Sequence, residues 1–163
     1  MTDSLTHLDA QGRARMVDVG HKPPMRRRAV AECHFMAAPA TLDRVIAADL
    51  PKGEALAVAR LAGIGAAKRC DELVPLCHTL PLDAVAVDFE RTAPDRLRVV
   101  ATATTTARTG VEMEALLAVA TAALTLWDMT KGVDSALHIE GLRLLEKAKE
   151  PAESDGRAQG GRP

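Results

Sequence analysis

Two reactive side chains stand next to each other in a stretch that is otherwise apolar. In LVPLCHTLPL (73–82), Cys77 and His78 are flanked on both sides by prolines and leucines. They lack partners for a zinc site, because Cys70 lies 7 residues upstream and the chain has no CxxC or HxxxH pattern. Such a cysteine is commonly a small buried apolar residue, whereas a histidine held at a rigid turn can bind a ligand. The stretch favours a functional His78, with a structural histidine as the alternative.

Carboxylates open a predicted helix in TGVEMEAL (109–116). Glu112 and Glu114 stand where acids complement the helix dipole by roughly 0.3–1 kcal/mol, so a structural role is the simpler interpretation. Residues two apart on a helix point about 200° apart. The two carboxylates therefore cannot serve one surface site in the same way.

An acid–base pair closes the same helix in WDMTKGV (127–133). Asp128 and Lys131 are three residues apart and share a helix face. An exposed pair contributes only tenths of a kcal/mol to stability, while burial beside Trp127 would couple the two groups and shift the lysine pKa. The spacing leaves open a solvated pair and a proton-transferring pair.

Three basic features could bind an anion. Lys52 precedes the N-terminus of a predicted helix, which is a position suited to phosphate. Lys68 lies late in that helix, and RRR (26–28) precedes a predicted strand. Each is also compatible with ordinary solvated charge.

The candidate residues are too far apart to meet within one helix. Glu114 and Asp128 are 14 residues apart, which corresponds to about 21 Å along a helix. A site that uses both must draw on other elements, and we expect it to draw on other subunits. The nearly all-apolar stretch 115–127 independently predicts an oligomer, because such a helix is covered on most sides.

Composition narrows the class of protein. The 163 residues are 47% hydrophobic and 26% charged with a net charge of −1, as in an ordinary globular domain. The small net charge gives no general attraction to nucleic acid. Aromatic side chains that could stack on bases are scarce, with one Trp, two Phe and no Tyr. No apolar run approaches the roughly 20 residues of a membrane span, and the N-terminus has no apolar signal core. With three cysteines at no familiar spacing, we expect a reduced, cytoplasmic protein.

The periodicity of apolar residues predicts the elements and the fold class. We expect strands over 28–36, 83–92, 96–107 and 137–147, and helices over 41–50, 54–71 and about 20 residues from 111. The order β-α-α-β-β-α-β predicts an α+β, ferredoxin-like antiparallel sheet with helices packed on one face. Residues 1–27 are expected to form an N-terminal arm, 28–149 a single catalytic domain, and 150–163 a disordered tail. Gly63 and Gly65 in the second helix would let another backbone come close.

Taken together, LVPLCHTLPL, TGVEMEAL and WDMTKGVD resemble motifs of the molybdenum cofactor biosynthesis protein C family, the cyclic pyranopterin monophosphate synthases. The resemblance extends to LTHLDAQGRARMVDVGHK, KGEALAVARLAGIGAAKR and RLLEK, and covers about residues 5 to 147. It implies a ferredoxin-like subunit in a homohexamer, a trimer of dimers with active sites at subunit interfaces. It also implies conversion of 3′,8-cyclo-7,8-dihydroguanosine 5′-triphosphate to cyclic pyranopterin monophosphate and diphosphate.

The resemblance assigns roles by matching positions. It implies catalytic roles for Asp128, Lys131, Lys52, Lys68 and His78. It implies substrate-binding roles for Leu76, Cys77, His78, Glu112, Met113, Glu114 and Arg27. Any of the three consecutive arginines 26–28 fits the family's arginine, and Arg27 is the match that we adopt.

The implied reaction uses no redox cofactor and no protein-bound metal, although Mg²⁺ is compatible with the triphosphate. The expected partners are the small nucleotide-derived substrate and further copies of the chain, without nucleic acid or membrane. Two other classes stay open. One is a non-catalytic ferredoxin-like module that binds a small anionic effector, and the other is a metal-binding protein that uses Cys70, Cys77 and His78.

Overall fold

A four-stranded antiparallel sheet and four helices form the subunit. The computed structural model describes residues 11–152. The strands are β1 (Met25–Met36), β2 (Leu82–Ala93), β3 (Arg96–Ala107) and β4 (His138–Pro151). The helices are α1 (Pro39–Ile46), α2 (Ala55–Ala67), α3 (Cys70–Leu73) and α4 (Glu112–Thr130). The predicted α+β class is confirmed, and the order of elements agrees with the prediction except that α3 is an additional helix.

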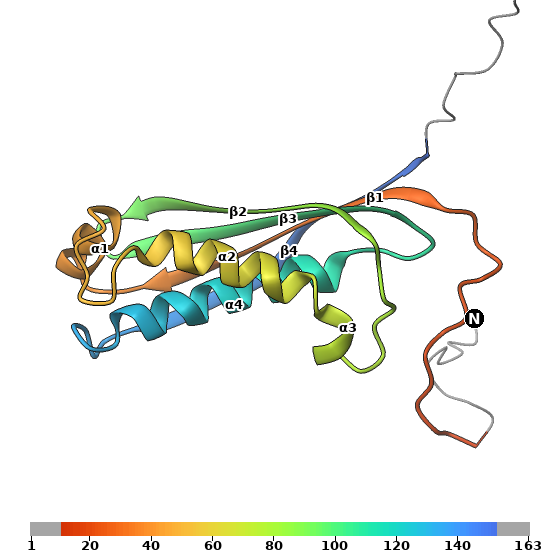
Figure 1. Cartoon of the computed structure of the whole chain (residues 1–163), viewed down its shortest axis with the longest axis horizontal. Coiled ribbons are helices and arrows are strands. Elements are labelled where there is room, and N and C mark those ends of the chain that lie inside the picture. Colours follow the sequence, from red (N-terminus) through yellow and green to blue (C-terminus); the bar gives the residue numbers. More distant parts are fainter. Residues whose placement is uncertain (1–10, 153–163) are drawn as a thin grey trace, which may run out of the picture.

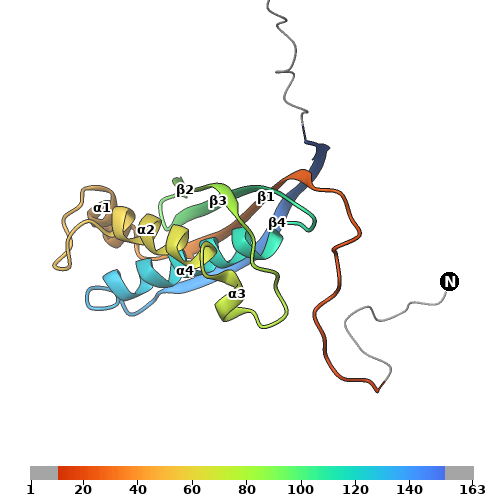
Figure 2. The ribbon, with the colours of Figure 1, turned by 45° about the vertical axis from the view of Figure 1, so that its right-hand side comes forward.

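The sheet has the strand order β2-β3-β1-β4, and each neighbouring pair is antiparallel. β2 and β3 form a hairpin, whereas β1 and β4 come from the two ends of the described chain. α2 and α4 lie against one face of this sheet (Figures 1 and 2). α1 lies at one end of the molecule, and α3 lies at the other end.

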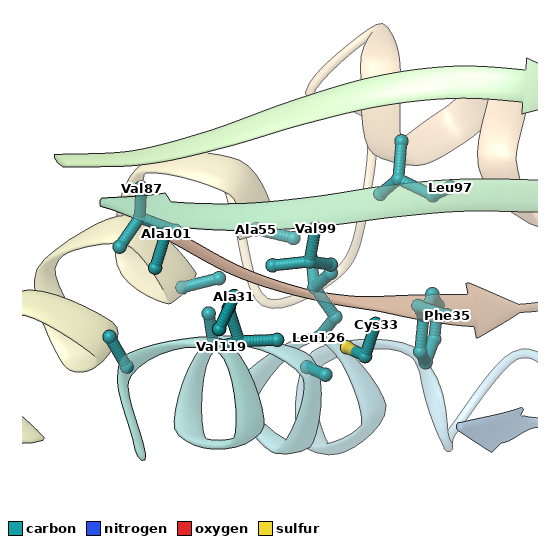
Figure 3. Packing of buried hydrophobic residues seen from close by; sticks show 14 of the residues in the cluster. Ala31, Cys33, Phe35, Ala55, Val87, Leu97, Val99, Ala101, Val119 and Leu126 are labelled. Carbon is teal, nitrogen blue, oxygen red and sulfur yellow. The ribbon is translucent and has the colours of Figure 1, made fainter. Parts of the chain in front are cut away.

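The core fills the space between the sheet and the helices (Figure 3). Every second residue of β3 from Leu97 to Ala107 is buried, as period-two alternation predicts. α4 contributes a buried stripe of small and apolar side chains: Ala115, Ala118, Val119, Ala122, Ala123 and Leu126. By length and composition alone α4 could cross a membrane, but half of its apolar window is buried inside the subunit, as in a core helix.

Small residues bring α2 and α4 together. A Cβ added at Gly63 would lie 2.7 Å from the carbonyl oxygen of Ala118 and 3.1 Å from Cγ2 of Val87. Glycine is therefore required there for the close approach of the two helices. A Cβ at Gly65 would meet nothing within 4 Å, so the predicted packing role applies to Gly63 and not to Gly65.

Several element boundaries differ from those predicted. The first strand begins at Met25, three residues before the predicted start at 28, and the last strand continues to Pro151. The helix predicted over 54–71 is divided, because Arg69 leaves helical geometry with φ −121° and ψ 24° before α3 begins. The helix predicted over 41–50 ends at Ile46, and Ala48 has a φ of 55°. Residues 11–24 of the predicted N-terminal arm lie outside the helices and strands. The rest of the arm over 1–10, and residues 153–163 of the predicted tail, lie outside the described residues.

The sheet face away from the helices carries a charged cluster. Glu32 of β1 is 3% exposed and accepts hydrogen bonds from Nε of Arg98 at 2.6 Å and Nε of Arg143 at 2.9 Å. Burial raises the pKa of Glu32, but the hydrogen bonds from the two arginines outweigh burial, and the pKa lies below its usual value. This cluster ties β1 to both of its neighbouring strands.

Candidate active site

Three of the predicted site residues meet in one cluster of charges. The ammonium of Lys52 lies 2.7 Å from Oδ2 of Asp128, and that of Lys131 lies 2.7 Å from Oδ1 of the same carboxylate. Nζ of Lys52 also donates to the main-chain oxygen of Asp128 at 2.7 Å. We call Lys52, Asp128 and Lys131 the lysine–aspartate cluster. The contact of Lys131 with Asp128 agrees with their spacing, while the contact with Lys52 joins segments 76 residues apart.

Local structure holds each member of the cluster. Asp128 is in the last turn of α4, and Lys131 is its C-cap residue. Lys52 lies in the turn between α1 and α2, where the N–H of Gly53 donates to the oxygen of Leu50 and Gly53 has a φ of 91°. That left-handed conformation favours glycine, so the turn is fixed by the sequence around Lys52.

The cluster has the electrostatics of an anion-binding site. Hydrogen bonds from Lys131 and then Lys52 lower the pKa of Asp128 to about 2. Asp128 is thus ionised at neutral pH, where it orients the two ammonium groups and does not itself donate a proton. The three side chains are 45%, 56% and 58% exposed, so a ligand can reach them. Two accessible ammonium groups next to one carboxylate can bind phosphate and transfer protons.

A pocket of about 420 Å³ lies at the other end of α4. It is lined by Val17, Val19, Lys22, Leu76, Cys77, His78, Leu80, Thr109, Gly110, Glu112, Met113 and Glu114. We call it the His78 pocket. The structure therefore brings together all of the predicted substrate-binding residues except Arg27.

Histidine and carboxylate groups in this pocket are held by specific contacts. Nε2 of His78 lies 2.8 Å from the main-chain oxygen of Val17. Burial raises the pKa of Glu114, which is 3% exposed, so the fold favours its protonated form. Glu112 opens α4 and pairs with Lys147 of β4. The two carboxyl groups thus line one pocket in different surroundings, because Glu114 is buried and Glu112 pairs with a lysine.

The cysteines near the pocket are thiols. Burial raises the pKa of Cys77 and raises that of Cys70 well above its usual range. Cys77 lines the pocket and its thiol contacts that of Cys70, which in turn contacts Glu114. Cys77 therefore suits the substrate-binding role that the family resemblance implies, as part of the pocket lining, and a raised thiol pKa does not favour a nucleophile. Within residues 11–152, no three His, Cys, Asp or Glu side chains are grouped so that they could hold a metal ion.

The remaining predicted residues lie outside both groups. Lys68 is exposed at the C-cap of α2, at the opposite end of that helix from Lys52. Arg27 donates from Nη2 to the main-chain oxygen of Arg108 at 3.2 Å, and its Nε is buried without a partner among the described residues. Arg28 instead pairs with Glu146. The contact with Arg108, which shortly precedes α4, puts Arg27 at the same end of α4 as the His78 pocket.

One subunit does not join the two halves of the predicted site. The His78 pocket is at the beginning of α4 and the lysine–aspartate cluster is at its end, about 21 Å apart for 14 residues of helix. Sequence reasoning also missed six residues that line the pocket: Val17, Val19, Lys22, Leu80, Thr109 and Gly110. The first three lie in a segment without periodicity, which gave no signal beyond its similarity to the family motif.

Comparison with known proteins covers both halves of the site. A model of the MoaC family matches residues 16–150. The chain is 56% identical over 144 residues, 88% of each chain, to the cyclic pyranopterin monophosphate synthase of Herpetosiphon aurantiacus. It is 53% identical over 146 residues to that of Chloroflexus aggregans, covering 89% of this chain and 88% of the relative. It is 54% identical over 144 residues to cyclic pyranopterin monophosphate synthase 3 of Mycobacterium tuberculosis, covering 88% and 81%.

Proposed function

Because this chain belongs to the MoaC family, as the match over residues 16–150 shows, we propose that it is an enzyme that forms cyclic pyranopterin monophosphate. Its substrate is 3′,8-cyclo-7,8-dihydroguanosine 5′-triphosphate, and diphosphate is the second product. The reaction is a lyase-type step of molybdenum cofactor biosynthesis. The observation that supports it best is the lysine–aspartate cluster, which lies in the matched range and fits an anionic substrate.

The lysine–aspartate cluster suits the phosphate chemistry. A hydroxyl of the substrate loses its proton and attacks the α-phosphorus. The bond between the α-phosphorus and the oxygen that bridges it to the β-phosphorus breaks, and diphosphate leaves. This step needs positioning and neutralisation of charge more than a covalent intermediate. Lys52 and Lys131 can supply both, and either ammonium can pass a proton, while Asp128 holds them in place. Lys68 and Arg27 complete the set of cations that we assign to the triphosphate.

The His78 pocket suits the half of the substrate that derives from guanine. That half carries N–H groups, which carboxylate and carbonyl oxygens accept well. Glu112, Glu114 and His78 line the pocket together with Met113 and Leu76, which offer apolar contact to a ring. Glu114 can also act as an acid, because burial keeps it protonated more readily than an exposed carboxyl group.

The assembly that we propose is a homohexamer of ferredoxin-like subunits in the cytoplasm, with active sites at the interfaces. The strand order β2-β3-β1-β4, with helices on one face, supports the ferredoxin-like description. Large apolar side chains on the outer face of the helices support an interface: Leu61 is 70% exposed and Leu124 is 60% exposed. A groove of about 360 Å³ runs there between α2, α3 and α4. A second subunit would also bring its lysine–aspartate cluster to the His78 pocket of the first.

No cofactor is needed for this reaction, because no electrons are exchanged between substrate and products. We assign Mg²⁺, where it takes part, to the triphosphate as a substrate-bound ion. Diphosphate release measured with and without a chelator tests this assignment. Complete loss of turnover after removal of a metal that copurifies with the protein would contradict it.

Release of diphosphate from the cyclic dihydroguanosine triphosphate is the test of the function. We expect the native protein to release diphosphate and form a pterin product, and Lys131→Ala to lower kcat by about 100-fold or more, because it removes a proton-transferring cation. Arg44→Ala is the control, since Arg44 is an exposed cation of α1 whose ion-pair partner within residues 11–152 is Asp49. No release by well-folded native protein would favour the non-catalytic module that binds an anionic effector.

A further inference from the structure

The segment before β1 reaches the His78 pocket with a main-chain group. Nε2 of His78 is 2.8 Å from the carbonyl oxygen of Val17, and Val17, Val19 and Lys22 line the pocket. In Figure 1 this segment runs at the same end of the molecule as α3 and the loop that precedes β2. The contact joins residues 61 positions apart, and it is the only hydrogen bond of the His78 ring among the described residues.

A carbonyl oxygen can only accept a hydrogen bond. Nε2 of His78 must therefore carry the hydrogen in this contact. In a neutral imidazole, the other nitrogen, Nδ1, is then an acceptor. We propose that Val17 is a positioning residue, whose main-chain oxygen fixes His78 in the Nε2–H tautomer and leaves Nδ1 to accept a hydrogen bond from the substrate.

The segment is folded in a way that fixes the direction of this carbonyl group. Oδ1 of Asp18 accepts a hydrogen bond from the N–H of Gly20 at 2.7 Å. The N–H of Lys22 donates to the oxygen of Val19 at 3.0 Å. These two turns follow directly after Val17. They turn the chain so that side chains of the same segment also line the pocket.

The tautomer decides what His78 can do in the pocket. The other polar side chains that line it include Lys22, a donor, and the carboxyl groups of Glu112 and Glu114. An unprotonated Nδ1 would add a neutral acceptor that can also take a proton from a ring N–H of the substrate. This consequence rests on the proposed function, whereas the tautomer itself does not.

Nitrogen NMR of the full-length oligomer tests the tautomer directly. We would label the histidines with ¹⁵N, record magic-angle spinning spectra in neutral buffer, and assign His78 by comparison with His78→Gln. We expect a protonated Nε2 and an unprotonated Nδ1. A protonated Nδ1, alone or together with a protonated Nε2, would overturn the proposal. The same spectra from a protein that releases no diphosphate would overturn only the proposed function.

The role of Val17 is tested by weakening its carbonyl group. Semisynthesis can replace the amide between Val17 and Asp18 by an ester, whose carbonyl oxygen is a poorer acceptor. We expect the ratio of the two His78 tautomers to change by about two- to tenfold, the range that loss of one hydrogen bond allows. The same ester between Met16 and Val17 is the control and should leave the ratio unchanged. An unchanged ratio with the first ester would overturn the role of Val17.

Side-chain substitution separates the two ring nitrogens. The amide nitrogen of glutamine can take the place of Nε2, so His78→Gln keeps a donor for Val17 and loses the acceptor at Nδ1. We expect kcat/KM of His78→Gln to fall by roughly tenfold or more, as for His78→Ala, because the acceptor is missing in both. Native kcat/KM in His78→Gln would show that the contact with Val17 is the whole role of His78, and the proposed function of Nδ1 would be wrong.

Discussion

At the residue scale, the pKa values of two carboxyl groups on α4 are shifted in opposite directions. Asp128 stands between two ammonium groups at the exposed end of the helix, and its pKa is lowered to about 2. Glu114 is buried at the other end beside Cys70, and burial raises its pKa. One helix thus carries a permanent carboxylate and a carboxyl group that protonates readily. Enzymes divide acid and base roles between carboxyl groups in this manner.

The raised pKa of Glu114 makes a prediction about stability and pH. The folded state favours the protonated form, so the stability from this group is present below its ordinary pKa of 4.5 and is lost as the pH rises through the raised value. The glutamine of Glu114→Gln never ionises. This variant should therefore be more stable than the native protein in neutral buffer, and equally stable below the ordinary pKa of 4.5. Urea unfolding at fixed protein concentration measures the difference. A Glu114→Gln protein less stable than native at neutral pH would contradict the prediction.

Residue types and motif spacing predicted most of the site residues but not all of their contacts. The ion pair of Asp128 with Lys131 follows from positions three apart on a helix. The contact of Lys52 with Asp128 depends on where the turn after α1 lies in the fold, which no local pattern encodes. The contact of Val17 with His78 uses a main-chain oxygen, and every residue has one, so the side-chain sequence carries no signal for it.

At the element scale, the packing of α2 on α4 depends on one glycine. Gly63→Ala should destabilise the protein by about 1–3 kcal/mol, because the added Cβ meets the backbone of α4 and overpacks the interface. Gly65→Ala is the matched control in the same helix, where the Cβ meets nothing within 4 Å. It should stabilise by up to about 1 kcal/mol through helix propensity. Thermal or urea unfolding of both variants checks the pair, and equal effects would refute the packing argument.

The charged cluster on the open face of the sheet provides a second test at this scale. Glu32→Gln should lower stability by about 1–3 kcal/mol at neutral pH, because Arg98 and Arg143 lose their charged acceptor. The pKa of Glu32 is lowered, so its contribution is present above the ordinary value of 4.5 and lost as the pH falls through the lowered value. Glu90→Gln is the control, since Glu90 is exposed and, among the described residues, pairs with one arginine, Arg98. It should cost less than about 1 kcal/mol. Equal losses of stability from the two substitutions would show that burial of Glu32 does not increase the contribution of its ion pairs to stability.

Elements were predicted better than their ends. The alternation of β3 and the apolar face of α4 are strong periodic signals, and both elements lie within a few residues of their predicted ranges. The break between α2 and α3 was missed, because KRC continues the helical pattern and the change in backbone direction at Arg69 arises from packing of Cys70 into the interior. Local propensity sets the type of an element, and tertiary contacts decide where it stops.

At the scale of the whole molecule, the arrangement of α4 separates two incomplete groups. The His78 pocket offers acceptors for a ring and few cations, whereas the lysine–aspartate cluster offers cations on an exposed surface. The triphosphate and the ring of one substrate need both kinds of surface. Exposed leucines on the outer face of α2 and α4 form an apolar surface that the proposed oligomer would cover. The length of the helix between Glu114 and Asp128 predicted that the two groups would lie apart. The sequence did not predict which surfaces of two subunits would come together.

Mixing two impaired variants tests whether subunits share the site. Lys131→Ala damages only the lysine–aspartate cluster, and His78→Ala damages only the pocket. If each site takes one half from each of two subunits, random co-assembly should leave about a quarter of the sites with both halves intact, because symmetric interfaces pair the subunits at random. We therefore expect coexpressed variants to recover about a quarter of native diphosphate release, above the residual activity of either variant alone. Lys131→Ala with Asp128→Ala is the control, since both changes damage the same half and no mixture can repair it. No recovery in the first mixture would show that each subunit completes its own site. Recovery in the control would show that Asp128 and Lys131 do not belong to the same half.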